Sequence, residues 1–237
     1  MWLAAVASGA VAGAALSGAG TANATCASIS GVGNGNGCTS TATSFALGLG
    51  NGTTATAAGT FSGAVAVGTN ATAQSFGDLS FAGAFGDGAR TLTGAPGLLG
   101  TPGTANIAVA VGKNASSFAI GVGNFAVAVG NPGNNPGINI PGLSGAPNTT
   151  GTAETSAEGA GTFNRAFAFG NGSLALANGG DPTNPLGSVG NNTAIALGGN
   201  TTSYAGQIPL QPLTGNTPNN QFAFSGPGKI AVNNVNL

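Results

Sequence analysis

Apolar and small residues alternate along this chain in short phrases that end in glycine. Three of these phrases, Val109-Ala-Val-Gly112, Phe118-Ala-Ile-Gly121 and Val127-Ala-Val-Gly130, follow one another at a nine-residue interval. Such alternation is the periodicity of a β-strand, and a glycine followed by Asn, Thr or Asp is typical of a turn. The pattern therefore predicts one strand and one turn in every nine residues.

The same phrase recurs before and after this stretch, for example in Phe45-Ala-Leu-Gly48, Val65-Ala-Val-Gly68 and Ile195-Ala-Leu-Gly198. Gly59, Gly68, Gly77 and Gly86 are also nine residues apart. Three segments rich in Pro and Gly, at about 91–105, 131–161 and 207–220, lack the period. We expect these segments to leave the repeat as loops.

A single nine-residue unit cannot bury an apolar face, so the units are expected to stack. Two units per coil of about 18 residues predict an all-β fold, a single-stranded parallel β-solenoid or β-roll over 44–237. Val109 would then pair with Val127, while Phe118 and Ile120 face them across a thin core. The predicted core residues are Val65, Val67, Phe76, Phe85, Val109, Val111, Phe118, Ile120, Val127, Val129, Phe167, Phe169, Ile195 and Leu197. The predicted turn glycines are Gly48, Gly68, Gly77, Gly86, Gly112, Gly121, Gly130, Gly170 and Gly198.

The N-terminal segment resembles an export signal. Residues 3–22 are apolar and small without a charge, and Ala22-Asn-Ala24 is a small-x-small cleavage site. The pattern predicts a signal peptide over 1–24 that is removed after Ala24. Because Met1-Trp2 carries no basic residue, two alternatives stay open: the true start lies upstream, or the segment remains as an anchor.

Cys26 and Cys38 are the two cysteines of the chain, and they bracket a Gly/Asn-rich stretch. In an exported protein such a pair favours a disulfide, which would close an N-terminal segment over 25–43. The alternatives are two free thiols or a metal site, and zinc would need further ligands in a chain with no His and no other Cys.

The composition of the chain argues against several classes of function. Charged residues make up 4% of the chain, the net charge is −1 and His is absent. Four basic residues cannot neutralise a run of phosphates, so nucleic-acid binding is not expected. A Ser-His-Asp or Cys-His arrangement is excluded, and we expect neither an enzyme nor a cofactor or metal site. A carbohydrate-active enzyme would require Asp78, Asp87 or Asp181 to converge with Arg90 or Arg165.

Polar residues after the repeat glycines are interpreted as turn residues. Asp78 and Asp87 each follow a glycine, nine residues apart, which would place them on opposite edges of a coil. A row of calcium ions would need a carboxylate in every turn, and most turns here offer neutral Asn. Asn-x-Ser/Thr sequons are also interpreted as turns rather than glycosylation sites; they begin at Asn51, Asn70, Asn114, Asn148, Asn171, Asn191 and Asn200.

The repeated phrase resembles the head-domain repeats of YadA-like trimeric autotransporter adhesins. Val65-Ala-Val-Gly68, Phe118-Ala-Ile-Gly121 and the related phrases above carry this resemblance, in separated blocks of the chain. It implies a left-handed β-roll, three chains packed side by side and a surface that binds host matrix or other cells. Coils of that family are somewhat shorter, and the resemblance includes neither its coiled-coil stalk nor its membrane-anchor strands, so autotransport is not implied.

We therefore expect an exported bacterial β-roll protein, secreted or at the cell surface, that adheres to a host or matrix protein or to a glycan. It would have no integral membrane segment once the signal is removed. The alternative is a purely structural or self-assembling surface protein, as a homotrimer or another self-associated form, without a specific ligand.

Overall fold

The computed structural model describes residues 25–34, 37–94, 103–130, 156–170, 173–178, 190–198, 201–206, 222–226, 230–232 and 235–236. The described residues form β-strands and no helix, so the chain is all-β as predicted. The predicted signal peptide at 1–24 and the predicted loop at 207–220 lie outside the described residues.

The strands form two sheets of ten, which we term sheet A and sheet B. In spatial order, sheet A contains β18 (Phe222–Ser225), β16 (Thr193–Leu197), β14 (Arg165–Phe169), β12 (Phe125–Val129), β10 (Ile107–Val111), β8 (Phe81–Phe85), β6 (Gly63–Val67), β4 (Phe45–Leu49), β1 (Thr25–Ile29) and β2 (Val32–Gly33). Sheet B contains β20 (Val235–Asn236), β19 (Ile230–Val232), β17 (Thr202–Gly206), β15 (Leu174–Asn178), β13 (Ser156–Thr162), β11 (Ser116–Val122), β9 (Arg90–Thr93), β7 (Thr72–Ser75), β5 (Thr54–Ala57) and β3 (Cys38–Ser40).

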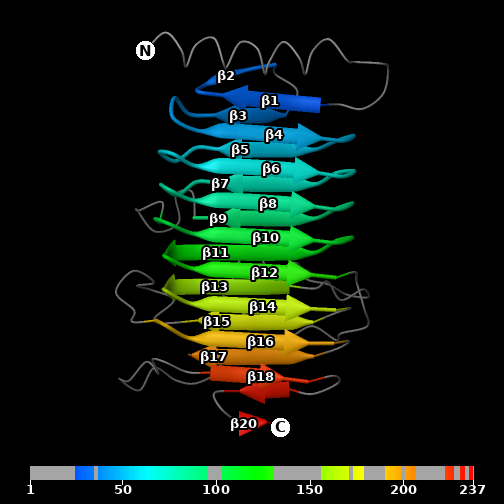
Figure 1. The fold of residues 1–237 in the computed structure, drawn as a ribbon, viewed down its shortest axis with the longest axis vertical. Helices are drawn as coiled ribbons and strands as arrows, with labels where there is room; N and C mark the ends of the chain where they lie inside the picture. Colours follow the sequence, from blue (N-terminus) through cyan, green and yellow to red (C-terminus); the bar gives the residue numbers. More distant parts are fainter. Residues whose placement is uncertain are drawn as a thin grey trace, which may run out of the picture.

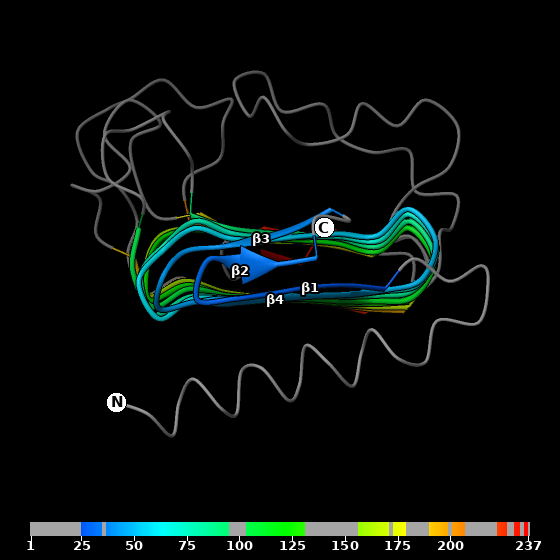
Figure 2. The same ribbon diagram turned by 90° about the horizontal axis from the view of Figure 1, so that it is seen from above.

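From β3 to β19 the chain passes alternately from one sheet to the other, and each strand pairs in parallel with the strand two places on (Figure 1). We call one strand of each sheet, with its connections, a coil. Viewed from above, the coils superimpose as two flat layers that face each other (Figure 2). The predicted ladder is confirmed, because Val109 pairs with Val127 and Val111 with Val129.

The space between the two sheets is filled by small side chains. In β10, for example, Ala108 and Ala110 are fully buried, whereas their neighbours Ile107, Val109 and Val111 are not. Alanine occupies most inward positions of both sheets, with Ser, Thr, Cys and Gly at the others. A core of this kind lets the two layers approach closely, because no long side chain holds them apart.

The predicted core is therefore wrong in its choice of strand face. All fourteen residues assigned to it are half-buried or exposed. Phe76 directly follows β7, and the other thirteen occupy outward positions of strands: Val65, Val67, Phe85, Val109, Val111, Phe118, Ile120, Val127, Val129, Phe167, Phe169, Ile195 and Leu197. Alternation with period two defines two faces of a strand but does not say which of them is buried. The alanine face is the one that fits between the layers.

A column of glycines stacks at the corner where each strand of sheet A ends. A Cβ atom added to Gly112 (φ 120°) would lie 2.2 Å from the carbonyl oxygen of Gly130 in the next coil. The amide of Gly130 in turn donates to the carbonyl oxygen of Val111, at 2.8 Å. Only glycine allows this close approach with a positive φ. The column consists of Gly50, Gly68, Gly86, Gly112, Gly130, Gly170 and Gly198.

Seven of the nine predicted turn glycines lie at corners, six of them in this column. Gly77 lies at the opposite corner, and its φ is not positive. The other two predictions need correction. Gly48 lies inside β4 and faces the interior, and Gly121 lies inside β11, where its φ is 116°. A glycine in a strand-like phrase is thus not always the residue that ends the strand.

The opposite corner holds a column of buried polar residues, one just before each strand of sheet A. The Oδ1 atom of Asn106 accepts the backbone N–H of Asn124 at 3.0 Å, and Asn124 accepts that of Asn164 at 2.8 Å. The same bond links Ser44 to Ser62, at 3.1 Å. Such bonds join most consecutive members of the column without charge. Its members are Ser44, Ser62, Ser80, Asn106, Asn124, Asn164 and Asn192.

Insertions change the length of a coil but not its register. Equivalent residues of the polar column are 18 residues apart in regular coils, and 26, 40 and 28 apart where the chain makes an excursion. Two predicted loops are too long. Arg90–Thr93 is strand β9 although 91–105 was assigned to a loop, and Ser156–Thr162 is strand β13 although 131–161 was assigned to one.

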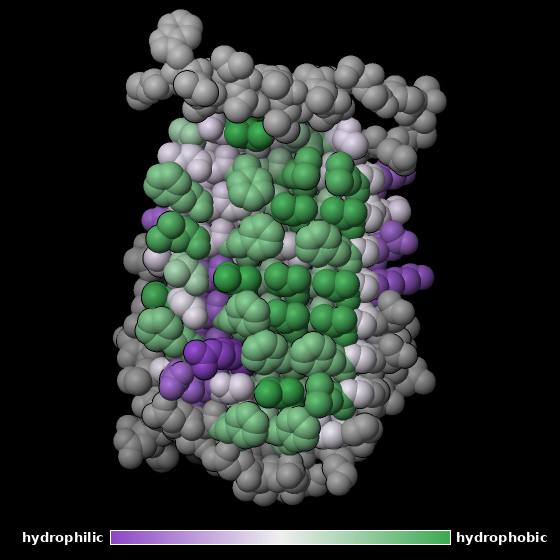
Figure 3. Space-filling model, in the orientation of Figure 1, coloured by the Kyte–Doolittle hydropathy of each residue, from purple (hydrophilic) through white to green (hydrophobic). Residues whose placement is uncertain are grey.

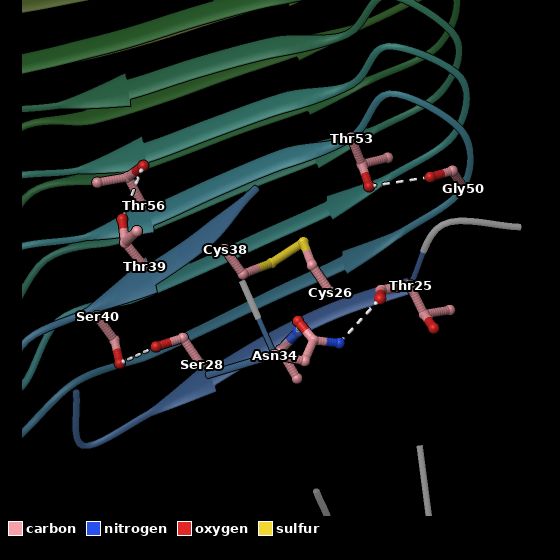
Figure 4. The surroundings of a disulfide bond; sticks show 11 residues. Thr25, Cys26, Ser28, Asn34, Cys38, Thr39, Ser40, Gly50, Thr53 and Thr56 are labelled. Carbon is pink, nitrogen blue, oxygen red and sulfur yellow. Dashed lines mark hydrogen bonds between the residues drawn. A yellow bond between two sulfur atoms is a disulfide. The ribbon is translucent and has the colours of Figure 1, made fainter. Parts of the chain in front are cut away.

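The N-terminal end of the stack is closed by a reversed strand and a disulfide. Strand β1 pairs antiparallel with β4, and Cys26 of β1 is bonded to Cys38 of β3, which confirms the predicted disulfide (Figure 4). The bond joins sheet A to sheet B inside the core, where both cysteines are buried. Gly48 provides the space for it, since a Cβ added there would lie 2.5 Å from the Cys26 sulfur.

Strand β2 pairs with the end of β1, at Ser28 and Ile29, and a side chain occupies the rest of that edge. Asn34 accepts the backbone N–H of Ala27 with its Oδ1 atom, at 3.2 Å, and donates from Nδ2 to the carbonyl oxygen of Thr25, at 3.0 Å (Figure 4). Exposed strand edges promote pairing with other chains. Asn34 thus blocks the addition of a further strand at this position.

The alanine core predicts a sharp difference between two Ala→Val substitutions. Ala110→Val adds two methyl groups between the layers and should lower the free energy of unfolding by about 1–3 kcal/mol through overpacking. Ala58→Val, at an exposed position, should change it by less than about 0.5 kcal/mol. Chemical denaturation followed by circular dichroism measures both. Equal stability of the two variants would contradict an interior that has no room for a side chain larger than alanine.

The disulfide should stabilise the closed end. The double substitution Cys26→Ala with Cys38→Ala opens a loop of 12 residues and is expected to lower the free energy of unfolding by roughly 3 kcal/mol. Denaturant titration under oxidising conditions provides the measurement. Under reducing conditions the wild-type chain and the variant should unfold at similar denaturant concentrations. A difference that persists after reduction would show that the cysteine side chains matter for another reason.

Candidate binding surfaces

The outer face of sheet A presents three columns of mostly apolar side chains, one column for each outward position of a strand. The middle column is Leu47, Val65, Gly83, Val109, Val127, Phe167, Ile195 and Phe224. The flanking columns are Phe45, Gly63, Phe81, Ile107, Phe125, Arg165, Thr193 and Phe222 on one side, and Leu49, Val67, Phe85, Val111, Val129, Phe169 and Leu197 on the other.

Aromatic rings and glycines fit together on this face. The ring atoms of Phe45 and Phe81 lie over Gly63, where an added Cβ would meet them at 2.6 and 3.1 Å. Further along the face, the ring centroids of Phe125 and Phe167 are 5.4 Å apart. The rings therefore cover the gaps that the glycines leave, and the outward side chains form a continuous layer.

This apolar layer is as large as the largest apolar patch of a typical monomer, about 300–600 Å². Eight strands about 4.8 Å apart, each with five residues rising about 3.3 Å, give a face on the order of 500 Å². Its first and last aromatic residues, Phe45 and Phe222, are 43% and 48% exposed. Figure 3 shows the hydrophobic layer over sheet A, and Arg165 is the charged residue on it among those the structure describes. A patch of this size commonly marks an interaction site.

Bulky apolar residues also project from the corner before the sheet A strands. Phe61, Leu79 and Phe163 are 67%, 62% and 58% exposed, and each has a φ of 52° or 53°. A positive φ is unfavourable for large side chains and is often kept for function. These residues extend the apolar surface around the edge of sheet A.

The outer face of sheet B is polar in its N-terminal half. Thr54, Thr72 and Arg90 follow one another in one column, and Thr56 and Gln74 in the next. The two outer faces of the stack therefore differ in chemistry, although both consist of stacked parallel strands.

A hollow opens on this polar face, with a volume of about 270 Å³. It is lined by β7, β9 and β11, through Thr72, Gln74, Arg90, Thr91, Leu92, Ser116 and Phe118. The register explains the grouping, since Arg90 lies between Thr72 and Ser116, and Leu92 lies between Gln74 and Phe118. One guanidinium, several neutral polar groups and an aromatic ring thus share one small concavity.

The carboxylates of Asp78 and Asp87 accept backbone hydrogen bonds at the corners of the coil. The backbone N–H of Thr60 donates to Asp78 at 2.6 Å, and that of Thr69 donates to Asp87 at 2.8 Å. Asp78 precedes β8 and Asp87 follows it, so they lie at opposite edges of the coil as expected. Each one bonds the previous coil, as a turn residue does.

The residues of a carbohydrate-active centre are not brought together among the described positions. Arg90 lies on the outer face of sheet B and Arg165 on that of sheet A, while Asp181 lies outside the described residues. The described ranges hold no group of three or more His, Cys, Asp or Glu side chains that could bind a metal ion.

The sequon asparagines that the structure describes lie in turns. Asn70 and Asn114 follow the glycine column with φ values of 56° and 53°, and Asn191 has a φ of 64°. The N–H of Asn70 donates to the carbonyl oxygen of Asn51 in the preceding coil, at 2.8 Å. Asn148, Asn171 and Asn200 lie outside the described residues.

Neither the apolar face of sheet A nor the hollow on sheet B was predicted from the sequence, although the sequence carries a signal for the apolar face. In the phrases of sheet A, alanine is nearly constant while the alternate position varies among Val, Phe, Ile, Gly, Arg and Thr. Gly63, Gly83 and Arg165 occupy that varying position, and a packed core would not accept all three. The constant residue marks the interior. The hollow depends on pairing between strands far apart in sequence, so no local pattern shows it.

Comparison with protein-family models, with curated proteins and with solved structures finds no match for the chain. Within the part of the chain that the structure describes, no helix has the length and apolar character needed to cross a membrane.

Proposed function

We propose that this chain is an exported parallel β-solenoid that associates with copies of itself through the outer face of sheet A, forming an adhesive scaffold at a bacterial surface or in its matrix. The observation that carries the proposal is the exposed layer of aromatic and aliphatic side chains on that face. The solenoid supplies a rigid support, and the exposed layer supplies the attraction.

A second copy of the chain is the occupant that fits this face best. Two such faces in contact would bury roughly 1,000 Å² in total, which reaches the lower limit for a specific interface. The columns run the length of the stack with a constant strand spacing, so the face of one copy can match that of another over its whole height. A net charge of −1 leaves little repulsion between copies.

The resemblance to YadA-like heads supports the same arrangement, since those heads pack three chains side by side. Export is supported by the signal pattern at 1–24 and by a disulfide, a bond that persists in oxidising compartments. Adhesion is supported by the hollow on sheet B, because that hollow lies on the face that association through sheet A would leave free. A scaffold without a ligand is the alternative function.

Two lysines placed on the apolar face should separate the copies. Val109→Lys with Val127→Lys puts adjacent positive charges in the middle column, and the variant is expected to be monomeric where the wild-type chain is oligomeric. Size-exclusion chromatography with light scattering measures the mass, and circular dichroism verifies the fold. A trimer would favour the adhesin-like arrangement, and an open-ended series would favour a filament.

The matched control is Thr39→Lys with Thr56→Lys, which places the same charge pair on neighbouring strands of sheet B. This variant should keep the wild-type oligomeric state. A monomeric wild-type chain, or dissociation of both variants alike, would refute association through sheet A.

A further inference from the structure

The hollow on the outer face of sheet B has the features of a ligand site. We propose that it binds one carboxylate-bearing sugar ring, such as a uronic acid residue of a glycan. This inference deepens the adhesive part of the proposed function, and it does not depend on self-association, which uses the opposite sheet.

Three of the polar side chains around the hollow have no role in the hydrogen bonding of the fold. Among the described residues, the side chains of Thr72, Gln74 and Arg90 form no hydrogen bond or ion pair. Other polar side chains of the stack bond the backbone of a neighbouring coil, as Asn106 does with the next coil and Asp87 with the preceding one. Three unused polar groups at one concavity are therefore available to an external ligand.

The strand register holds these groups at fixed spacings. Arg90 stands beside Thr72 on the adjacent strand, about 4.8 Å away, and the next column along the same strands lies about 7 Å distant. That next column contains Gln74 and Phe118 on either side of Leu92. Charge, neutral donors and an aromatic ring thus surround a space wide enough for one small ring.

The chemistry of the lining selects the ligand. A guanidinium binds a carboxylate through two parallel hydrogen bonds. The Thr72 hydroxyl and the Gln74 amide can both donate and accept, which suits sugar hydroxyls. Phe118 is half-buried and offers an apolar surface to the C–H face of a sugar ring. A volume of about 270 Å³ suits one ring rather than a longer oligosaccharide bound end to end.

A single basic side chain also argues against more highly charged ligands. Among the residues that the structure describes, Arg90 is the one cation that lines the hollow. Sulfated polymers and nucleic acids bind to arrays of several Lys and Arg residues, because each neutralised anion adds to the affinity. One guanidinium matches one carboxylate.

The test is a titration of the full chain with methyl β-D-glucuronide and with its neutral counterpart, methyl β-D-glucoside, followed by NMR or calorimetry at constant ionic strength. We expect the glucuronide to bind about tenfold more tightly, the effect of one charge-assisted contact. Sodium acetate tests the carboxylate alone and should bind more weakly than the glucuronide. Equal affinities for the two sugars, or equal affinities for acetate and glucuronide, would overturn the proposal.

Substitutions assign the binding to the hollow. Arg90→Gln should remove the preference for the glucuronide, Arg90→Lys should retain part of it, and Phe118→Leu should weaken both sugars alike. Arg165→Gln removes the same charge from sheet A and should leave the titration unchanged. A loss that is the same for Arg90→Gln and Arg165→Gln would indicate attraction by overall charge and refute the site.

The monomeric variant Val109→Lys with Val127→Lys separates this proposal from the previous one. It should bind the glucuronide as the wild-type chain does, because its changes lie on sheet A. If the sugar binds but the wild-type chain is monomeric, the site holds and association fails. If the chain associates but does not distinguish the two sugars, association through sheet A holds and the sugar site fails.

Discussion

The close approach of two flat β-layers is the constraint on which the rest of this structure depends. Alanine, serine and threonine side chains fill the interior, and each alanine contributes little hydrophobic area by itself. Regular repetition compensates, since backbone hydrogen bonds link every coil to the next along the whole stack. The larger side chains have no room inside, and their placement on the outer surface follows directly from this geometry.

The corners keep the layers aligned. On one side, glycines leave free the space where a Cβ atom would collide with the carbonyl oxygen of the next coil. On the other side, Ser and Asn side chains bond the backbone of the next coil. Neither device uses a charged group, which explains how a chain with 4% charged residues can be so regular. An ionised column would bring like charges to neighbouring strands, at a cost in stability. Asp78 and Asp87 are tolerated because each stands alone in its column and lies at a corner.

Much of this fold could be predicted from the sequence, because its strands follow a nine-residue repeat of apolar, Ala and Gly positions. The nine-residue phrase was enough to pair Val109 with Val127. A single pair of cysteines after an export-like segment favoured the disulfide between Cys26 and Cys38 over free thiols or a metal site. The inward face was not predicted, since hydrophobicity alone favours Val over Ala in a core, whereas the spacing between layers decides the matter here. The buried positions of Asn106 and Asn124, just before two strands of sheet A, were not predicted either. The hollow beside Arg90 was not predicted, because it forms only when β7, β9 and β11 pair in one register, and the sequence does not show that pairing.

The disulfide makes the two ends of this repetitive stack of coils different from each other. In a stack where each coil contacts only its neighbours, opening starts most easily at an end, and the coils then separate one after another. At the N-terminal end, Cys26 and Cys38 tie the two layers together covalently, and a reversed strand covers the first parallel pair. The C-terminal end also carries a reversed strand, β20 against β19, but both cysteines of the chain lie at the other end. Opening is therefore expected to start more easily at the end without the disulfide, and a protease or a pulling force would meet more resistance at the end that has it.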